Sequence, residues 1–333
     1  MKIAITGSSG HIGNNLAREL INRGHQIKVL INKSKQALDG MQVERIHGNI
    51  LDTEAVEGLI NGCEYVFHAA AIISIGNKPP QKVYNVNTEG TKNVVNACLK
   101  FGVKRLVHFS SIHSFHCKNP NAVLNEDNPP AGVKDLTYNK SKAMGESIVS
   151  EAYKKGLNAV ILNPSSVVGP NDFMPSLIGQ MILKIAKGRL PFLIIGGYHF
   201  VDVRDVVDAA INAMHSGRAG EKYLLTSEWK SLTEVAGIIC KKARKRAPIV
   251  LPTFMAWLGL PFIQIFSRLM NQKPLYTRES IKIIKKAPRR VENCKAIREL
   301  DFRTRPVQET FSDVYDWFVA QNYLPKPRNY DRY

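Results

Sequence analysis

The first 21 residues constrain the fold of this chain more than any other stretch. Segment 2–6 (KIAIT) is a short apolar run of the kind found in buried strands. Glycines follow at positions 7, 10 and 13, and apolar residues then recur at helical intervals through 14–21. A site for a dinucleotide pyrophosphate requires a strand, a tight glycine turn and a helix whose first amides point at the anion. We therefore predict a dinucleotide site at the start of the chain.

Strands and helices alternate beyond this turn. We predict strands over 26–31, 43–46, 64–68 and 104–109, a helix from residue 53 with Thr53 as its N-cap, and helices through 84–99 and 135–155. Alternation without hairpin signals is typical of a parallel sheet covered by helices on both faces. The predicted fold class is therefore α/β, with a doubly wound parallel sheet of the Rossmann type.

The composition of the chain limits the classes of partner that it can bind. A chain of 333 residues with 44% hydrophobic content can form one large core or two. Its formal net charge of +18 suits a phosphorylated cofactor, an acidic substrate or an anionic membrane. Nucleic acid is not expected, because no nucleic-acid-binding motif accompanies the charge. Five scattered cysteines without metal-ligand spacing predict free thiols in a reducing cytoplasm and no metal site, and the early glycine turn leaves no room for a signal peptide.

The end of the second predicted strand bears on the choice between NAD and NADP. NAD-specific folds usually place an acidic side chain there, where it binds the ribose 2′-hydroxyl. This chain has Asn32, Lys33, Ser34 and Lys35 instead. Two ammonium groups suit a 2′-phosphate, so NADP(H) is expected in preference to NAD(H). The alternative is that this stretch is simply a solvated basic turn.

Three side chains carry the predicted chemistry. Tyr138 and Lys142 lie four residues apart in a predicted helix, which stacks them on one face. A neighbouring ammonium lowers the pKa of a phenol, so that Tyr138 could exchange a proton near neutral pH. Ser111 follows the strand 104–109, at the sheet edge where ligands bind, and its hydroxyl could polarise a carbonyl. A Tyr-x-x-x-Lys pair alone is usually a surface helix pair, but its place after the glycine turn favours a catalytic role.

Together these motifs resemble the extended short-chain dehydrogenases/reductases, the NAD-dependent epimerase/dehydratase superfamily. The matching segments are 6–13 (TGSSGHIG), 87–91 (NTEGT), 107–111 (VHFSS), 138–142 (YNKSK), 162–170 (LNPSSVVGP) and 200–206 (FVDVRDV). Segment 163–165 and the tail 295–302, followed by Pro306 and Trp317-Phe318, are similar to the dihydroflavonol-reductase and 3β-hydroxysteroid-dehydrogenase branch.

The resemblance implies a catalytic role for Ser111, Tyr138 and Lys142, although an alignment shifted by one residue gives the serine role to Ser110. Hydride would pass between nicotinamide C4 and a carbinol carbon. In the reductive direction Tyr138 would donate the proton, Lys142 would also hold the nicotinamide ribose, and Ser111 would hydrogen-bond the carbonyl oxygen.

The resemblance also implies the cofactor site. Its residues would be Gly7, Ser9, Gly10, His11, Ile12, Asn32, Lys33, Asn49, Ile50, Ala69, Ala70, Ala71, Asn87, Tyr138, Lys142, Asn163, Ser165 and Ser166. Two positions depart from the family pattern. Asn49 stands where an aspartate near the adenine is common, and Asn32 stands where NADP-using relatives often have an arginine.

By the same resemblance, 1–163 with about 200–228 would form the dinucleotide-binding domain, and 164–199 with about 229–333 a smaller substrate domain. A helix over 200–214 and a strand over 221–226 would return to the first domain. His113, Phe115 and His116 directly follow the catalytic serine and are candidates for lining the substrate pocket, without an acid–base role.

Segment 247–267 contains no charged residue and follows the basic run 241–246 (KKARKR). It is long enough to span a bilayer, but Pro248, Pro252 and Pro261 argue against one uninterrupted helix. Two readings remain open. The segment forms a pocket wall or homodimer surface, or 241–270 rests on an anionic membrane. We expect a cytoplasmic protein, with membrane association as the open alternative.

The expected function is NAD(P)-dependent oxidation or reduction of a secondary alcohol or carbonyl in a fairly apolar small molecule. A nucleotide-sugar epimerase or dehydratase with tightly bound NAD is the alternative, because it uses the same serine, tyrosine and lysine. A non-catalytic NADP-binding sensor is the third possibility.

Overall fold

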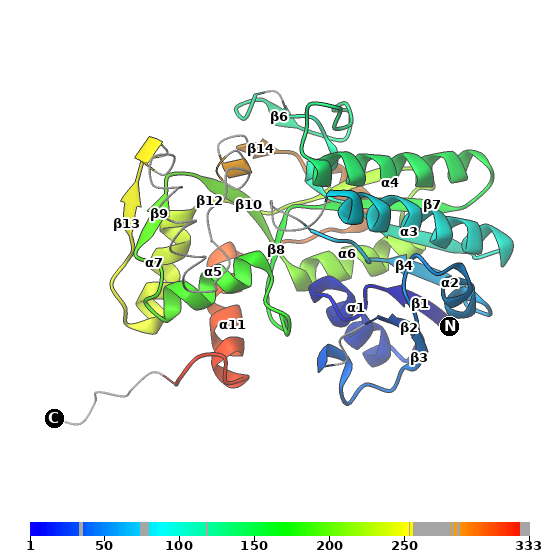
Figure 1. The fold of residues 1–333 in the computed structure, drawn as a ribbon, viewed down its shortest axis with the longest axis horizontal. Helices are drawn as coiled ribbons and strands as arrows, with labels where there is room; N and C mark the ends of the chain where they lie inside the picture. Colours follow the sequence, from blue (N-terminus) through cyan, green and yellow to red (C-terminus); the bar gives the residue numbers. More distant parts are fainter. Residues whose placement is uncertain are drawn as a thin grey trace.

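A parallel sheet of seven strands forms the centre of the computed structural model, which describes residues 1–32, 36–73, 80–117, 119–252, 254–255, 281, 283–284 and 287–326 (Figure 1). Its strands are β1 (Lys2–Thr6), β2 (Gln26–Ile31), β3 (Glu44–His47), β4 (Tyr65–His68), β5 (Arg105–Phe109), β7 (Ala159–Pro164) and β11 (Lys222–Leu225). Their order is β11-β7-β5-β4-β1-β2-β3, and every neighbouring pair is parallel. The order reverses between β1 and β4, which is the switch point at which such sheets bind ligands. The predicted doubly wound α/β fold is confirmed.

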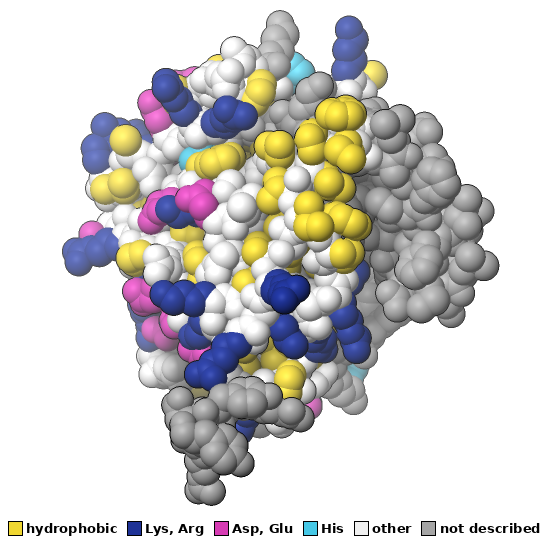
Figure 2. Space-filling model, turned by 90° about the vertical axis from the view of Figure 1, so that its left-hand side faces the viewer, with side chains coloured by type: hydrophobic (Ala, Val, Ile, Leu, Met, Phe, Trp, Pro, Cys, Tyr) yellow, Lys and Arg dark blue, Asp and Glu magenta, His cyan; other side chains and the backbone are white. Residues whose placement is uncertain are grey.

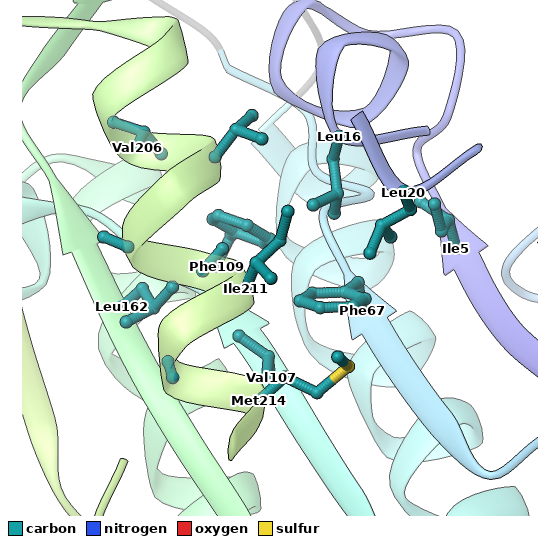
Figure 3. Packing of buried hydrophobic residues seen from close by; sticks show 14 of the residues in the cluster. Ile5, Leu16, Leu20, Phe67, Val107, Phe109, Leu162, Val206, Ile211 and Met214 are labelled. Carbon is teal, nitrogen blue, oxygen red and sulfur yellow. The ribbon is translucent and has the colours of Figure 1, made fainter. Parts of the chain in front are cut away.

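Helices cover both faces of the sheet. The first face packs against α1 (His11–Asn22), α6 (Val203–Ser216) and α10 (Cys294–Leu300), and the second against α2 (Thr53–Ile60), α3 (Pro80–Lys100) and α4 (Thr137–Lys154). Side chains along β5 point alternately to the two faces of the sheet, so this strand contributes to both cores. Val107 and Phe109 face α6, and Leu106 faces the opposite side. The side chains that meet in the first core include Phe67, Val107, Phe109, Leu16, Leu20 and Ile211 (Figure 3).

A second hydrophobic core lies beside this sheet. It is built from α5 (Leu177–Ala186), α7 (Leu232–Ala243) and α11 (Val307–Ala320), together with residues of β8 (Ser166–Val168), β9 (Phe192–Ile194) and β10 (Gly197–Asp202). At its centre the rings of Phe200 and Phe311 meet edge to face, 5.1 Å apart. The smaller strands pair as β12 (Trp229–Ser231) with β10, β13 (Ile249–Leu251) with β9, and β14 (Arg290–Val291) with β6 (Val123–Leu124). Helix α10, within the stretch predicted for the substrate domain, packs in the first core through Ala296 and Leu300.

The starts of α2 and α6 differ from prediction. The helix α2 is capped by Asp52 and not by Thr53, because the Asp52 carboxylate accepts bonds from the amides of Glu54 and Ala55. The predicted helix over 200–214 begins only at Val203. Residues 200–202 complete β10, which pairs with β8, and Asp202 then caps α6 by accepting from the Arg204 amide.

Cys63, Cys98, Cys240 and Cys294 are free thiols, as predicted. Within the described residues, no helix is both long enough and apolar enough to cross a bilayer.

Candidate active site

The glycine turn forms a close-packed cradle between β1 and α1. Gly7 adopts φ 71°, and its carbonyl accepts a 2.9 Å hydrogen bond from the Gly10 amide. A Cβ on Gly7 would lie 2.6 Å from the backbone of Ala69, and a Cβ on Gly13 would lie 2.2 Å from the Gly7 oxygen. No side chain caps α1 at Gly10, and the first turn carries no acidic residue. Its leading amides can therefore bind an anion.

The predicted cofactor residues gather along the edge of the sheet where its strands end. Ser9, His11 and Ile12 lie at the turn, Asn32 after β2, Asn49 and Ile50 after β3, Ala69, Ala70 and Ala71 after β4, and Asn163, Ser165 and Ser166 at the end of β7 and in β8. Lys33 lies outside the described residues. Ser110 and Ser165 are buried at this edge, and their hydroxyls have no hydrogen-bond partner among the described residues. The narrow turn, the uncapped helix and these hydroxyls fit a dinucleotide.

The side chains of His11 and Asn87, both predicted cofactor residues, make hydrogen bonds within the protein. Nε2 of His11 lies 3.1 Å from the Gly169 carbonyl oxygen and 3.0 Å from that of Pro170. The Asn87 amide exchanges two hydrogen bonds with the Ile72 backbone and donates a third, of 2.9 Å, to the Ser141 hydroxyl. Asn87 therefore ties the strand-end segment 69–72 to the helix that carries Tyr138.

Asn14 and Asn15 were not singled out from the sequence, although they join the two sides of the site. The Asn14 side chain donates to the Asn171 carbonyl at 3.0 Å, and that of Asn15 donates to the Pro170 carbonyl at 3.1 Å. The first helix thus holds the turn 169–171, which follows β8. No local pattern marks the partners, because they lie more than 150 residues away in the chain.

The structure brings Ser111, Tyr138 and Lys142 together. Ser111 begins the short turn η2 (Ile112–Ser114) and accepts a 3.2 Å hydrogen bond from the His113 amide. Its hydroxyl lies close enough to the Tyr138 phenol to lower the pKa of that group. Lys142 is buried one helical turn beyond Tyr138, and its Nζ donates a 2.7 Å hydrogen bond to the Phe109 carbonyl. Of the two serines, the one next to the phenol is Ser111.

Burial shifts both ionisable groups toward their neutral forms. It raises the pKa of Tyr138 to about 12, and the hydrogen bond with Ser111 lowers that pKa only in part. Burial also lowers the pKa of Lys142 to about 8, against the opposing charge of Glu146. The expectation that Lys142 lowers the pKa of Tyr138 is therefore wrong for this arrangement. The ammonium is bonded to the Phe109 carbonyl, and burial of the phenol dominates.

One of the three residues proposed to line the pocket contacts the tyrosine. The His113 ring stands edge to face with Tyr138, with centroids 6.2 Å apart, and burial lowers the pKa of His113 to about 4. It is therefore neutral at physiological pH. His116 hydrogen-bonds Asp135 at 2.9 Å, and Phe115 is buried beside Leu224.

Comparisons with known proteins agree with this geometry. Residues 3–225 match the model of the NAD dependent epimerase/dehydratase family. The chain is 32% identical to "Sterol demethylase protein B" of Methylococcus capsulatus, over 96% of this chain and 98% of that one. It is 27% identical to a "Putative dihydroflavonol 4-reductase" of Synechocystis sp., over 96% and 95%.

Among solved structures, that of gox2253 superposes with a TM-score of 0.83 at 28% identity, covering 97% of this chain and 99% of that one. Both sequence relatives fit the branch that the sequence motifs resemble. The chain belongs to the NAD-dependent epimerase/dehydratase family of extended short-chain dehydrogenases/reductases and is an NAD(P)-dependent oxidoreductase.

Proposed function

We propose that this protein interconverts a secondary alcohol and a ketone on an apolar, sterol-like substrate. The observation that carries the proposal is the contact of Ser111 with Tyr138 one helical turn from Lys142, on the sheet edge that bears the dinucleotide turn. The substrate class comes from the sterol named for a relative that is similar along almost its whole length.

The residues divide the chemistry between them. A bound nicotinamide would supply or accept the hydride. Because the pKa of Tyr138 is about 12, its phenol carries a proton at neutral pH and can donate it to a ketone oxygen. Ser111 would orient that oxygen through a hydrogen bond, and the ammonium of Lys142 would stabilise the phenolate that forms.

We infer a preference for NADP(H) over NAD(H). Strand β2 ends at Ile31, and the next four residues include no acidic side chain that could bind a ribose 2′-hydroxyl. Asn32 is exposed at this point, which leaves room for a 2′-phosphate.

A substrate screen tests the proposed function. Purified protein is offered 3-hydroxysterols, flavonoid-like alcohols, simple secondary alcohols and nucleotide sugars, and reduction of NADP⁺ or NAD⁺ is followed by absorbance. Net turnover of a sterol or another apolar alcohol with a freely exchanging cofactor supports the proposal. Tightly retained NAD and conversion of a nucleotide sugar without net redox change would establish the epimerase or dehydratase alternative. Cofactor binding without any turnover would favour the sensor.

We also propose that the edge ribbon β9–β13 contacts an anionic membrane. Residues 173–201 and 235–252 contain no aspartate or glutamate. The basic turns before the two strands lie side by side, because a Cβ on Gly188 would lie 3.9 Å from Cδ of Lys245. Lys187, Arg189 and Arg246 are exposed there as well.

Exposed apolar side chains accompany these charges, which favours a lipid surface over a purely ionic partner. Ile195, Ile249 and Phe254 are 56%, 62% and 65% exposed. Figure 2 shows hydrophobic side chains gathered on this side of the molecule, with lysines and arginines below them. Apolar side chains among lipid headgroups and cations at the phosphates are the usual means of peripheral attachment. Residues 253 and 256–270, the rest of the predicted membrane element, lie outside the described residues.

Vesicle sedimentation tests this contact. We expect binding to vesicles of mixed phosphatidylcholine and phosphatidylglycerol at low salt, release at high salt, and no binding to phosphatidylcholine alone. Exchanging Lys245 and Arg246 for glutamate should weaken binding by at least roughly 1 kcal/mol per residue, whereas Lys154→Glu at the end of α4 should not. Absence of binding at low salt contradicts the contact, and a stable dimer in solution that buries this ribbon would establish the alternative interface.

A further inference from the structure

A buried carboxylate lies behind the proposed catalytic residues. Glu146 follows Lys142 by one turn of α4 and is 2% exposed. One of its oxygens accepts a 2.5 Å hydrogen bond from the Asn163 side chain, and the other accepts a 2.5 Å bond from Nζ of Lys222. Lys222 lies at the start of β11 and is partly exposed, so the ion pair runs from the molecular surface to the interior.

The carboxylate determines which way the Asn163 amide faces. A carboxylate only accepts hydrogen bonds, so the NH₂ group of Asn163 must point toward Glu146. In that orientation the same nitrogen lies 3.1 Å from the Ser111 carbonyl oxygen and 3.1 Å from the Ser114 hydroxyl. The Ser114 hydroxyl in turn donates to the Ser111 carbonyl at 2.8 Å. These hydrogen bonds fix the backbone of Ser111, just before η2, and the side chain of Ser114, at its end.

We propose that Glu146 is a positioning residue for the reaction, acting on Ser111 through Asn163 and on Lys142 through its negative charge. This inference rests on the proposed roles of Ser111 and Lys142. Glu146 contacts neither serine nor the reacting atoms. Its effect is to hold Ser111 in place and to keep Lys142 charged.

The effect of Glu146 on the charge of Lys142 depends on which other titratable groups face Lys142. On its own helix these groups are Tyr138 and Glu146, and on the packed strands they are His68 of β4 and His108 of β5. Burial lowers the pKa of both histidines, so they are neutral. Tyr138 is neutral too. Within the described part of the chain, this leaves Glu146 as the negative charge that favours the protonated amine of Lys142.

Titration of Lys142 tests the proposal without any substrate. Protein labelled with ¹³C at lysine Cε gives one NMR signal per lysine, and the signal missing in Lys142→Met is assigned to Lys142. The wild-type signal should titrate near pH 8. In Glu146→Gln, which keeps the side-chain size, it should titrate roughly one pH unit lower. In the matched control Lys222→Gln, which removes the other half of the ion pair, it should stay near the wild-type value or rise.

Steady-state rates test the positioning part once a substrate is identified. We expect kcat to fall roughly tenfold in both Glu146→Gln and Asn163→Leu, because both release η2. Glu146→Gln, which lies outside the predicted cofactor site, should leave the KM for the cofactor nearly unchanged. Only Glu146→Gln should also move the Lys142 titration.

Two results would overturn the proposal. The first is a Lys142 titration that is the same in wild type and Glu146→Gln. The second is a kcat unchanged in Asn163→Leu. If Glu146→Gln does not fold, an upward or unchanged Lys142 titration in Lys222→Gln supports the proposal and a downward shift refutes it. Failure of the whole protein to turn over any substrate would leave these titrations interpretable and would count against the proposed function instead.

Discussion

Among single residues, Asn32 bears most directly on which cofactor is used. It is exposed directly after β2, where a carboxylate would bind a ribose 2′-hydroxyl and repel a 2′-phosphate. We predict that Asn32→Asp weakens NADPH binding by about tenfold and strengthens NADH binding, because a like charge is placed beside the phosphate. Fluorescence titration of both cofactors measures the change. Tighter binding of NADH than of NADPH by the wild-type protein would contradict the inferred preference.

Among the elements, the glycine turn and the start of α1 leave no room for an added side chain. A Cβ on Gly13 would lie 2.2 Å from the Gly7 backbone oxygen. The backbone cannot shift at one of these two glycines without shifting at the other. We predict that Gly13→Ala lowers the free energy of unfolding by about 1–3 kcal/mol and abolishes tight cofactor binding. Urea unfolding and cofactor titration check the two effects.

Gly58 in α2 provides the matched control for that substitution. It also lies in a helix, but a Cβ there would meet nothing within 4 Å. Gly58→Ala should therefore raise the free energy of unfolding by about 0.5–1 kcal/mol and leave cofactor binding unchanged. Equal effects of the two substitutions would show that helix propensity, and not the closeness of the turn, sets the response at Gly13.

At this scale the sequence predicted the elements well and their side-chain partners poorly. The strands, the glycine turn and the Tyr138–Lys142 spacing follow from local periodicity, which is why β2 was predicted with its observed bounds. The cap of α2 and the start of α6 depend on which of several neighbouring polar groups meets a free amide. The contacts of Asn15 with Pro170 and of Glu146 with Lys222 join residues far apart in the chain, and no local pattern encodes them.

At the scale of the whole molecule, two buried histidines couple stability to pH. His68 hydrogen-bonds the hydroxyls of Thr6 and Thr91, at 2.7 and 3.0 Å, and its ring lies 5.1 Å from that of His108. Burial lowers the pKa of His68 to about 3 and that of His108 well below 6.5. Below pH 6.5 the unfolded chain binds protons that the folded chain does not, so the free energy of unfolding falls as the pH falls.

We predict that each of these histidines contributes a loss of about 1.4 kcal/mol per pH unit below pH 6. Urea unfolding between pH 7.5 and pH 5 measures the slope. His108 has no hydrogen-bond partner for its ring nitrogens among the described residues. His108→Leu should therefore reduce the slope by about 1.4 kcal/mol per pH unit without lowering stability at pH 7.5. A free energy of unfolding that is constant over this range would show that the histidines are charged in the folded protein.

In the proposed mechanism, different elements of the molecule bind the dinucleotide and supply the proton. The glycine turn and the strand ends would hold the dinucleotide, whereas Tyr138 would supply the proton from α4. The most direct measurement is therefore the turnover of Tyr138→Phe on the substrate found in the screen, beside its affinity for NADP(H). We predict that kcat falls by at least about a hundredfold while the dissociation constant of the cofactor changes less than about threefold. Turnover near the wild-type rate in this variant would contradict the mechanism.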